Sequence, residues 1–321
     1  MQKNHKNIII FGKNGQLANS LKNIFAKKNN HFDNIKNFKT TFFSSAEVDF
    51  NNIPALETFL SEITELPQVI INTTAFTAVD LAESEKEKCN NINHIAVGTL
   101  AKYCQKHNIL LIHYSTDYVF DGSGDEPFNE DNIKNLKPLN HYGQTKLLGE
   151  QAIAKSNCLN LVFRVSWLYD NRATSKNFVN TIKKMATTHQ IIKIVADQIG
   201  SPTNVDFISE NTLNILNKLE AKKLLPYQET VQRNNLGNNA FPNIFPSSFP
   251  SGIYHLNNKK FCSWFDFACE IVANLKNDNS FSNEKIIVEK ILPIKSSEYN
   301  FIATRPLNSR LNCRKIDLLL N

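Results

Sequence analysis

Long hydrophobic runs are absent from this sequence of 321 residues. No apolar stretch approaches the roughly 18 residues that a membrane-spanning helix needs. The apolar run that follows Met1–Lys6 is too short for the core of a signal peptide. We therefore expect a soluble protein of the cytoplasm that has no membrane partner.

Cysteine and clustered charge are also scarce. The six cysteines form no C-x-x-C pair and no metal-ligand spacing, so we expect reduced and mostly buried thiols, as in a cytoplasmic protein. The net charge is +6, but the lysines and arginines are scattered among acidic residues. Because no basic block with interleaved aromatic residues is present, we expect no binding of nucleic acid.

A buried strand, a glycine turn and a helix follow one another at the start of the chain. Residues 7–11 are a continuous apolar run, which is typical of a parallel strand buried on both faces. Gly12 and Gly15 come next in the spacing G-x-x-G-x-x-A, and an amphipathic helix begins near Gln16 and Leu17. This arrangement directs backbone N–H groups and a helix N-terminus at a pyrophosphate. The alternative interpretation is an ordinary tight turn.

The end of the second strand predicts the choice of cofactor. Residues 38–43 form that strand, and Ser44 and Ser45 follow it, where an NAD-selective site places a carboxylate. A 2′-phosphate would meet hydroxyl groups there, so we expect a preference for NADPH, with NADH also accepted. A shift of the strand by four residues would instead bring Glu47 into this position. Asp49 is interpreted either as a group near the adenine or as a helix cap.

Strands and helices alternate through the rest of the first half. Buried strands are predicted at 68–72, 109–114 and 159–165, with a long helix at 81–107 that breaks near Asn90. This alternation predicts an α/β fold with a doubly wound parallel sheet of the Rossmann type. Such sheets bind cofactors at the carboxyl ends of their strands. The small residues that follow the third strand and are candidates for cofactor contact are Thr74, Ala75 and Thr77.

A tyrosine and a lysine four residues apart form the centre of the expected active site. Tyr142 and Lys146 lie on a segment with a helical pattern, which places both side chains on one face. An ammonium beside a phenol lowers the phenol pKa from about 10, which makes Tyr142 a usable proton donor near neutral pH. Thr116 follows the strand at 109–114 and is delivered to the same sheet edge as the glycine turn. The alternative is a half-buried tyrosine beside a solvated lysine.

A series of motifs extends this pattern along nearly the whole chain. In order, the motifs are Gly12–Leu17, Asn72 with Ala75–Asp80, Ser115–Gly122, Pro138–Lys146, Gly149–Glu150, Arg164–Trp167, Asn177–Phe178, Asp197–Thr203, Gly252–Leu256, Cys262–Phe265 and Arg305–Ser309. Together they resemble the extended short-chain dehydrogenase/reductases and, within them, the dTDP-4-dehydrorhamnose reductases. An ordered series of this length is far more specific than any single motif.

The resemblance implies a reaction in nucleotide-sugar biosynthesis. It is the NAD(P)H-dependent reduction of the 4-keto group of dTDP-4-dehydro-L-rhamnose to dTDP-L-rhamnose. In this family Tyr142 would donate the proton, Lys146 would also bind the nicotinamide ribose, and Thr116 would hold the developing alkoxide. The residues expected to line the sugar pocket are Val79, Asp117 and Tyr118.

Two residues of the second half are further candidates for substrate contact. Trp167 would pack on the sugar or the nicotinamide, or else lie in the core. Arg305 suits a diphosphate because a guanidinium fork matches phosphate oxygens, and its alternative is a surface salt bridge. Some relatives bind Mg²⁺ through carboxylates at a dimer interface. Asn19 and Ser20 stand where this chain would supply one, so we expect no metal.

Two domains are expected. Residues 1–166 would form the dinucleotide-binding domain, with returning segments near 190–219 and 252–256. Residues 167–321 would form most of a smaller, discontinuous substrate-binding domain, and a homodimer is compatible with the resemblance. Within them, residues 220–250 are rich in Asn, Pro and Phe and are interpreted as a surface insertion.

Other functions on the same fold stay open at this point. A nucleotide-sugar 4,6-dehydratase would need an Asp-Glu pair after the threonine, and the chain has Asp117 and Tyr118. A related reductase would give the 4-epimeric 6-deoxy-talose product, which depends on the face of the ketone that meets the nicotinamide. The regulatory subunit of eukaryotic methionine adenosyltransferase also resembles this family, and it binds NADP as a non-catalytic partner.

Overall fold

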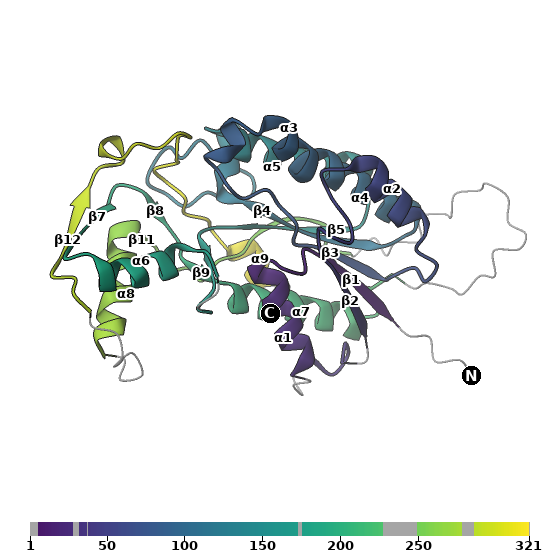
Figure 1. Ribbon diagram of the computed structural model, residues 1–321. Helices are drawn as coiled ribbons and strands as arrows, with labels where there is room; N and C mark the ends of the chain where they lie inside the picture. Colours follow the sequence, from purple (N-terminus) through teal and green to yellow (C-terminus); the bar gives the residue numbers. More distant parts are fainter. Residues whose placement is uncertain are drawn as a thin grey trace, which may run out of the picture.

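Six parallel strands form the centre of the molecule, in the order β2-β1-β3-β4-β5-β10 (Figure 1). The computed structural model describes residues 6–27, 32–36, 38–172, 175–226, 249–277 and 286–320. The strands are β1 (Asn7–Phe11), β2 (Lys39–Phe43), β3 (Val69–Asn72), β4 (Leu110–Thr116), β5 (Asn160–Val165) and β10 (Gly252–His255). The predicted doubly wound parallel sheet is confirmed.

The apolar runs of the sequence become strands because both faces of the sheet are covered. Alternate side chains of β1 point to opposite faces, so Ile8 and Ile10 enter one core while Ile9 and Phe11 enter the other. All seven residues of β4 are buried. Thr116 is the last of them and therefore lies at the carboxyl edge of the sheet.

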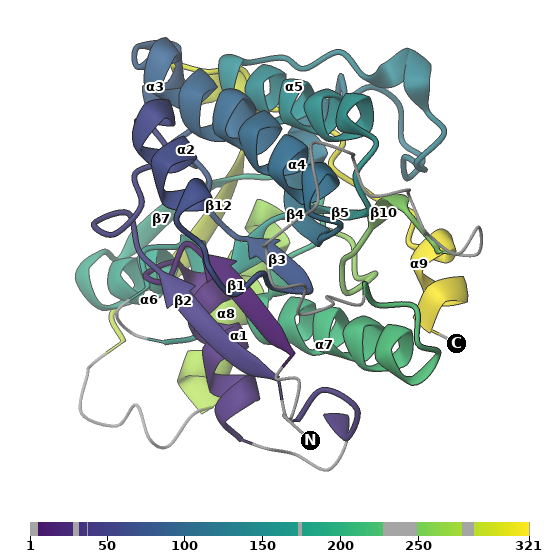
Figure 2. The same cartoon turned by 90° about the vertical axis from the view of Figure 1, so that its right-hand side faces the viewer.

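Helices cover the two faces as separate layers (Figure 2). One face carries α1 (Gln16–Ala26) and α7 (Val205–Ala221), with α9 (Arg314–Leu320) beside α7. The other face carries α2 (Ile53–Ser61), α3 (Lys86–Asn90), α4 (Ala96–Lys106) and α5 (His141–Ser156). The helix α5 therefore passes the carboxyl end of β4 with Tyr142 and Lys146 in its first two turns.

A smaller lobe lies beside the carboxyl edge and has its own apolar core. It contains α6 (Phe178–Thr188), β7 (Ile191–Val195), α8 (Trp264–Asn277) and β12 (Lys290–Ile294), at the left of Figure 1. The strands β7 and β12 pair with each other in parallel, not with the main sheet. Of the segment 190–219 that was expected to return to the first domain, only α7 packs on α1, whereas β7 belongs to this lobe.

Short elements connect the two parts. They are β6 (Leu168–Tyr169), β8 (Ile199–Gly200), β9 (Thr203–Asn204) and β11 (Cys262–Ser263), with the 3-10 turns η2 (Leu81–Glu83), η4 (Asp117–Val119), η5 (Ile133–Asn135) and η7 (Ser296–Glu298). The chain then returns from β12 to the main sheet through residues 295–313, which we name the connecting segment. Its Asn308 N–H donates to Gly122 O (3.0 Å) and its Ser309 N–H donates to Ile199 O (2.7 Å).

The long helix predicted at 81–107 is interrupted. A π-helical turn, η3 (Asn91–Ile95), separates α3 from α4 close to the predicted break at Asn90. Its Asn93 side chain accepts from Phe76 N–H (2.8 Å) and donates to Phe76 O (3.1 Å), which fixes the loop after β3. Single π turns inside helices are typical of functional sites.

Two further expectations concern segments outside the main architecture. Residues 227–248 of the predicted insertion at 220–250 lie outside the described residues. Among the helices of the described ranges, none is both long and apolar enough to cross a bilayer.

Candidate active site

The glycine turn after β1 lies at the carboxyl edge of the sheet and is held by backbone hydrogen bonds. The N–H groups of Gly12 and Lys13 both donate to Phe43 O (3.0 Å each), and Gly15 N–H donates to Gly12 O (2.8 Å). Gly12 has φ of +95°, and a Cβ there would meet Thr73 Oγ1 at 2.4 Å, so only glycine fits. Gly15 is the N-cap of α1 and offers no side-chain cap to the first turn of the helix. The N–H groups of the first helical turn, which begins at Gln16, and the helix dipole together suit a pyrophosphate.

The first residues of α1 are tied to the smaller lobe. Arg172 donates from Nη2 to Gln16 O (3.1 Å), and Asn177 donates from Nδ2 to Gln16 Oε1 (2.9 Å). Asp170 holds Arg172 through a 2.6 Å ion pair, while Leu17 is buried in the core. The sequence analysis gave Arg172 no role. The one feature of the sequence that pointed to this region was the neighbouring Asn177–Phe178 motif, in which Asn177 caps α6.

The loop after β3 forms the next part of the edge. Thr74 N–H donates to Asn72 Oδ1 (3.0 Å) at the strand end. Thr74 and Ala75 are half-buried, Thr77 is exposed, and Val79 is half-buried further along the loop. Because these side chains are small, the backbone of the loop can lie close to the turn at Gly12.

Thr116 and Tyr142 lie close together at the end of β4, where the Thr116 hydroxyl acts to lower the pKa of Tyr142. Thr116 Oγ1 also accepts from Tyr118 N–H (3.2 Å) and donates to Asp117 Oδ1 (3.1 Å). Asn140 caps α5 by accepting from Gly143 N–H (2.8 Å), which sets the start of the helix and the position of Tyr142. The structure thus brings the predicted threonine and tyrosine together.

Lys146 lies one turn further along α5 and is fully buried. Its Nζ donates to Tyr114 O (2.6 Å) and lies 3.3 Å from His113 Nε2. Burial lowers the pKa of Lys146 to about 8, although Glu150 and Cys89 oppose this shift. The alternative of a solvated lysine is therefore wrong.

The expected effect of Lys146 on the tyrosine is also wrong for this structure. Burial raises the pKa of Tyr142 above its ordinary value, and only the neighbouring Thr116 hydroxyl acts in the opposite direction. The reason is that Lys146 Nζ is directed at the β4 backbone and His113. Tyr142 is consequently fully protonated at neutral pH.

A buried ion pair holds α5 against the sheet. Glu150 accepts from Arg164 Nε (2.9 Å) and Nη2 (2.6 Å) and from Ser115 Oγ (2.5 Å). Both charged side chains are at most 2% exposed. Such a pair is costly to break, so it fixes the register of α5 relative to β4 and β5.

Asp117 and Tyr118 follow the threonine as the 3-10 turn η4. Burial raises the pKa of the Asp117 carboxyl to about 6, with the hydroxyls of Ser309 and Thr116 acting in the opposite direction. Among the described residues, Asp117 Oδ2 has no hydrogen-bond partner within bonding distance. The Tyr118 ring meets the Tyr142 ring edge-on, with centroids 5.7 Å apart.

The end of β2 was predicted to carry only neutral side chains, and the structure brings a carboxylate to it. Glu47 accepts from both the N–H and the hydroxyl of Ser44 (2.8 Å each), and its carboxylate lies 3.9 Å from Lys13 Nζ. A carboxylate therefore does reach the strand end, because the turn after β2 folds Glu47 back. The helix-cap interpretation of Asp49 is wrong, since Asn52 caps α2, while Asp49 accepts from Asn51 N–H (2.9 Å).

Trp167 and Arg305 have partners from distant segments. Trp167 has φ of +47° and stacks on Trp264 of α8 with ring centroids 3.5 Å apart. Arg305 forms a two-pronged ion pair with Asp80 (2.9 and 2.7 Å) and is 13% exposed, which matches its salt-bridge alternative more closely than a free diphosphate fork.

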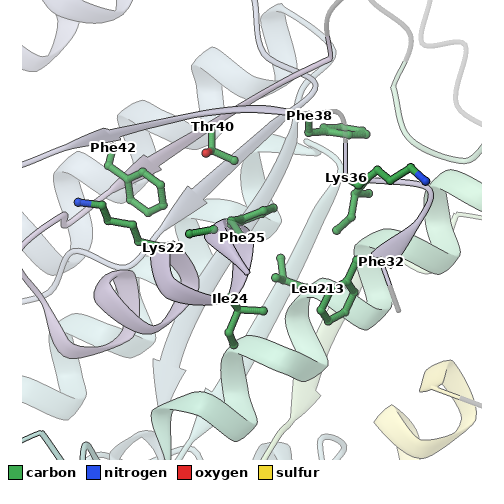
Figure 3. Close-up of a pocket in the computed structure, with 11 residues that line it drawn as sticks. Lys22, Ile24, Phe25, Phe32, Lys36, Phe38, Thr40, Phe42 and Leu213 are labelled. Carbon is green, nitrogen blue, oxygen red and sulfur yellow. The ribbon is translucent and has the colours of Figure 1, made fainter. Parts of the chain in front are cut away.

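A pocket of about 320 Å³ lies elsewhere, between the end of α1 and β2 (Figure 3). Its labelled lining is mainly apolar and includes Phe25, Phe38 and Phe42, with Lys22 and Lys36 as its charged groups. None of the predicted site residues contributes to it. In the parts of the chain that the structure describes, no three His, Cys, Asp or Glu side chains gather as metal ligands.

Comparison with known proteins matches this geometry to one family. The family model described as the RmlD substrate binding domain matches residues 6–237 and 238–321. A dTDP-4-dehydrorhamnose reductase of Escherichia coli K12 is 31% identical over 311 residues, which cover 96% of this chain and 90% of that protein. A dTDP-4-dehydrorhamnose reductase of Burkholderia thailandensis is 37% identical over 246 residues, which cover 77% of this chain and 74% of that protein.

Solved structures give the same result. The dTDP-4-dehydrorhamnose reductase of Bacillus anthracis in complex with NADP superimposes with a TM-score of 0.74 at 30% identity, and covers 98% of this chain and 92% of that chain. The reductase of that name from Clostridium acetobutylicum gives a TM-score of 0.76 at 28% identity, with 97% and 92% covered.

Proposed function

The chain belongs to the RmlD substrate binding domain family, and from that premise we propose that it reduces dTDP-4-dehydro-L-rhamnose to dTDP-L-rhamnose with NADPH. The observation that carries the proposal is the neighbouring pair of Thr116 and Tyr142 beside buried Lys146, at the sheet edge that also holds the glycine turn. A proton donor next to a nucleotide-binding turn is what a ketone reductase requires.

The residues at the sheet edge fit a dinucleotide. We propose that the N–H groups of the first turn of α1 hold the pyrophosphate and that Gly12 and Gly15 let it approach the backbone, because no acidic side chain occupies that helix end. Thr74, Ala75 and Thr77 would lie along the nicotinamide half. Gln16, Leu17 and Asp49 complete the proposed cofactor contacts. When bound, NADPH supplies the hydride for the ketone carbon.

Tyr142 is the proposed proton donor to the ketone oxygen. Its pKa is held high by burial, so its hydroxyl is protonated when the substrate binds, and Thr116 lies beside it. Thr116 would hold the same oxygen as negative charge develops there, which stabilises the transition state more than the ground state. Lys146 would bind the nicotinamide ribose and return a proton toward Tyr142.

The sugar would lie against η4 and the loop after β3. We propose that Asp117, with its unpartnered Oδ2, and Tyr118 contact the sugar directly, and that Val79 closes the pocket. Trp167 and Arg305 would shape the pocket from behind, because each is already engaged with Trp264 or Asp80. The pairing of Arg305 argues against a direct role on the diphosphate.

The setting of the reaction is part of the same proposal. All six cysteines are free thiols, which favours the reducing cytoplasm, where NADPH is available. The homodimer is proposed as well, and light scattering would test it as twice the 36.5 kDa chain mass.

Product analysis tests the function directly. The purified protein is incubated with dTDP-4-dehydro-L-rhamnose and NADPH, and the product is identified by NMR. We expect dTDP-L-rhamnose; a 6-deoxy-talose product would mean that the ketone binds with its other face toward the nicotinamide. Absence of NADPH oxidation, together with a stoichiometric partner enzyme, would replace the proposal with a regulatory role.

A further inference from the structure

A buried hydrogen-bond chain reaches Lys146 from the neighbouring strands. It starts at the Thr74 backbone N–H, which donates to Asn72 Oδ1 (3.0 Å). Asn72 Nδ2 lies 3.2 Å from His113 Nδ1, and His113 Nε2 lies 3.3 Å from Lys146 Nζ. The three side chains are at most 1% exposed, so each group must find its partner within this chain.

The backbone N–H at one end fixes the direction of every bond. A backbone N–H can only donate, so the atom of Asn72 that faces Thr74 must be the carbonyl oxygen, and its amide N–H₂ must face His113. His113 Nδ1 then has to accept. Because a neutral imidazole accepts at one nitrogen and donates at the other, the proton of His113 sits on Nε2 and points at Lys146.

An ammonium cannot complete this chain. A protonated Lys146 would carry three N–H donors and no acceptor, and would face the N–H of His113. A neutral amine has one lone pair for His113 Nε2–H and still donates to Tyr114 O (2.6 Å). The ammonium form would therefore cost one of the bonds between Thr74 and Lys146.

We propose that His113 is a positioning residue which, with its proton held on Nε2 by Asn72, keeps Lys146 as a neutral amine until the cofactor binds. This inference rests on the proposed role of Lys146 at the nicotinamide ribose. Ribose hydroxyls can accept hydrogen bonds, so contact with them favours the ammonium form. Binding of NADPH then takes up one proton from solvent onto Lys146.

The other charged groups around Lys146 are few. Glu150 lies one turn away on α5 and favours the ammonium, but Arg164 from β5 neutralises it through their ion pair. Cys89 from α3 faces Lys146 as a thiol, because burial raises its pKa. Burial also lowers the pKa of Lys146 to about 8, and that of His113 well below its ordinary value, which is the direction that a neutral amine and a neutral imidazole require.

The tautomer of His113 is the first test, and it needs no activity. Long-range ¹H–¹⁵N correlation spectra of the protein without cofactor distinguish Nε2–H from Nδ1–H, and the His113→Gln variant assigns the signal. His255 is an internal reference of the opposite tautomer, since its Nδ1 faces Phe128 O (3.1 Å) and its Nε2 faces Arg164 Nη1 (3.4 Å). We expect Nε2–H for His113; an Nδ1–H signal would overturn the proposal.

Proton uptake on NADPH binding is the second test. Calorimetry in buffers of different ionisation enthalpy at pH 9 should give an uptake of roughly one proton, since a group with pKa about 8 is mostly neutral there. In Asn72→Asp, the carboxylate accepts from both Thr74 N–H and His113 Nδ1–H. The direction of the hydrogen bonds is then reversed, so His113 Nε2 accepts from Lys146, which can be an ammonium before the cofactor binds. Uptake should then fall to about half or less.

Two comparisons keep the outcomes separate. His113→Gln offers Lys146 an amide oxygen and should lower the uptake as Asn72→Asp does, whereas His255→Gln should leave it unchanged. Equal uptake in wild type and in both site variants would reject the proposal even if the enzyme reduces the sugar. Conversely, the expected tautomer and uptake without any reduction of the keto sugar would reject the proposed function and leave this inference in place.

Discussion

The proposed reduction depends on the hydroxyl group of Tyr142. We expect Tyr142→Phe to lower kcat by roughly 10² to 10⁴, because the ketone oxygen loses its positioned proton donor. The dissociation constant for NADPH, followed by fluorescence titration, should change little. Tyr254→Phe is the control, since that hydroxyl donates to Pro250 O (2.8 Å) at the far edge of the sheet. A Tyr142→Phe enzyme with more than half of the wild-type kcat would remove Tyr142 from the mechanism.

Asp117 links stability to pH. In the folded protein burial raises the pKa of this carboxyl to about 6, whereas in the unfolded chain it is near 3.8. Between these values the folded state binds more protons, so stability falls as the pH rises from about 4 to 6 and stays lower above that. Asp117→Asn removes this dependence and should be more stable at pH 7 by about 3 kcal/mol.

Thermal unfolding at pH 4.5 and pH 7 measures the effect of Asp117→Asn. The stability difference should shrink from about 3 kcal/mol at pH 7 to about 1 kcal/mol at pH 4.5. The variant should lose activity because its amide does not replace the carboxylate at the proposed sugar contact. If the stability of wild type and variant changed with pH in the same way, burial would not raise the pKa of Asp117.

We expect Glu47 to oppose a 2′-phosphate at the end of β2. Its carboxylate holds Ser44 and attracts Lys13. Glu47→Gln removes the negative charge and releases Lys13, so the ratio of kcat/KM for NADPH to that for NADH should rise about two- to fivefold. Glu57→Gln, which removes an exposed carboxylate from α2, should leave the ratio unchanged. A fall of the ratio in Glu47→Gln would mean that the carboxylate supports binding of the phosphate.

At the scale of elements, α5 depends on a close approach to η3. A Cβ on Gly149 would stand 2.4 Å from Asn93 O, and Asn93 in turn holds the loop after β3. Gly149→Ala should therefore push α5 away from η3, cost about 1 to 3 kcal/mol of stability and lower kcat.

Gly98→Ala is the matched change on α4, where the new Cβ would lie 3.3 Å from Ala152 Cβ. Its unfolding free energy should stay within about 1 kcal/mol, since alanine also favours the helix. Chemical denaturation compares the two, and an equally mild effect of Gly149→Ala would contradict the argument.

The elements of the first half were predictable because local pattern decides them. Continuous apolar runs became β1 and β3, and the segment at 38–43 became β2. The glycine turn followed from its spacing, whereas the interpretation of the α5 pair needed the ordered series of motifs along the chain. What the sequence did not contain is the contact between Asn72, His113 and Lys146, which come from three elements that only the sheet order brings together.

Local pattern failed where a side chain turns back on its own loop. Glu47 was expected to stay outside the end of β2 unless the strand shifted, yet it reaches Ser44 through a tight turn with the strand in place. The parallel return of β10 and the separate pairing of β7 with β12 depend on contacts across many residues, which no window of the sequence records.

At the scale of the whole molecule, Arg305 and Asp80 join the connecting segment to the main sheet. The Arg305 guanidinium holds the pKa of Asp80 below its ordinary value, so the carboxylate stays charged and the pair intact above about pH 4. Arg305→Met should loosen the segment beside Tyr118 and raise KM for the sugar nucleotide about tenfold, with the NADPH dissociation constant unchanged. Lys260→Met, which breaks an exposed pair with Glu270 in the smaller lobe, should change neither value. A loss of NADPH binding in Arg305→Met would place the pair at the cofactor instead.

The stacked rings of Trp167 and Trp264 give the protein an optical reporter. The chain has only these two tryptophans, and they lie 3.5 Å apart with an angle of 8° between their planes. Indole transitions at that separation couple, so the near-ultraviolet circular dichroism should show a paired positive and negative band. Trp167 follows β5 of the main sheet and Trp264 begins α8 of the smaller lobe. Any ligand that shifts one lobe against the other will therefore change this couplet without a label, and its time course would follow the movement during turnover.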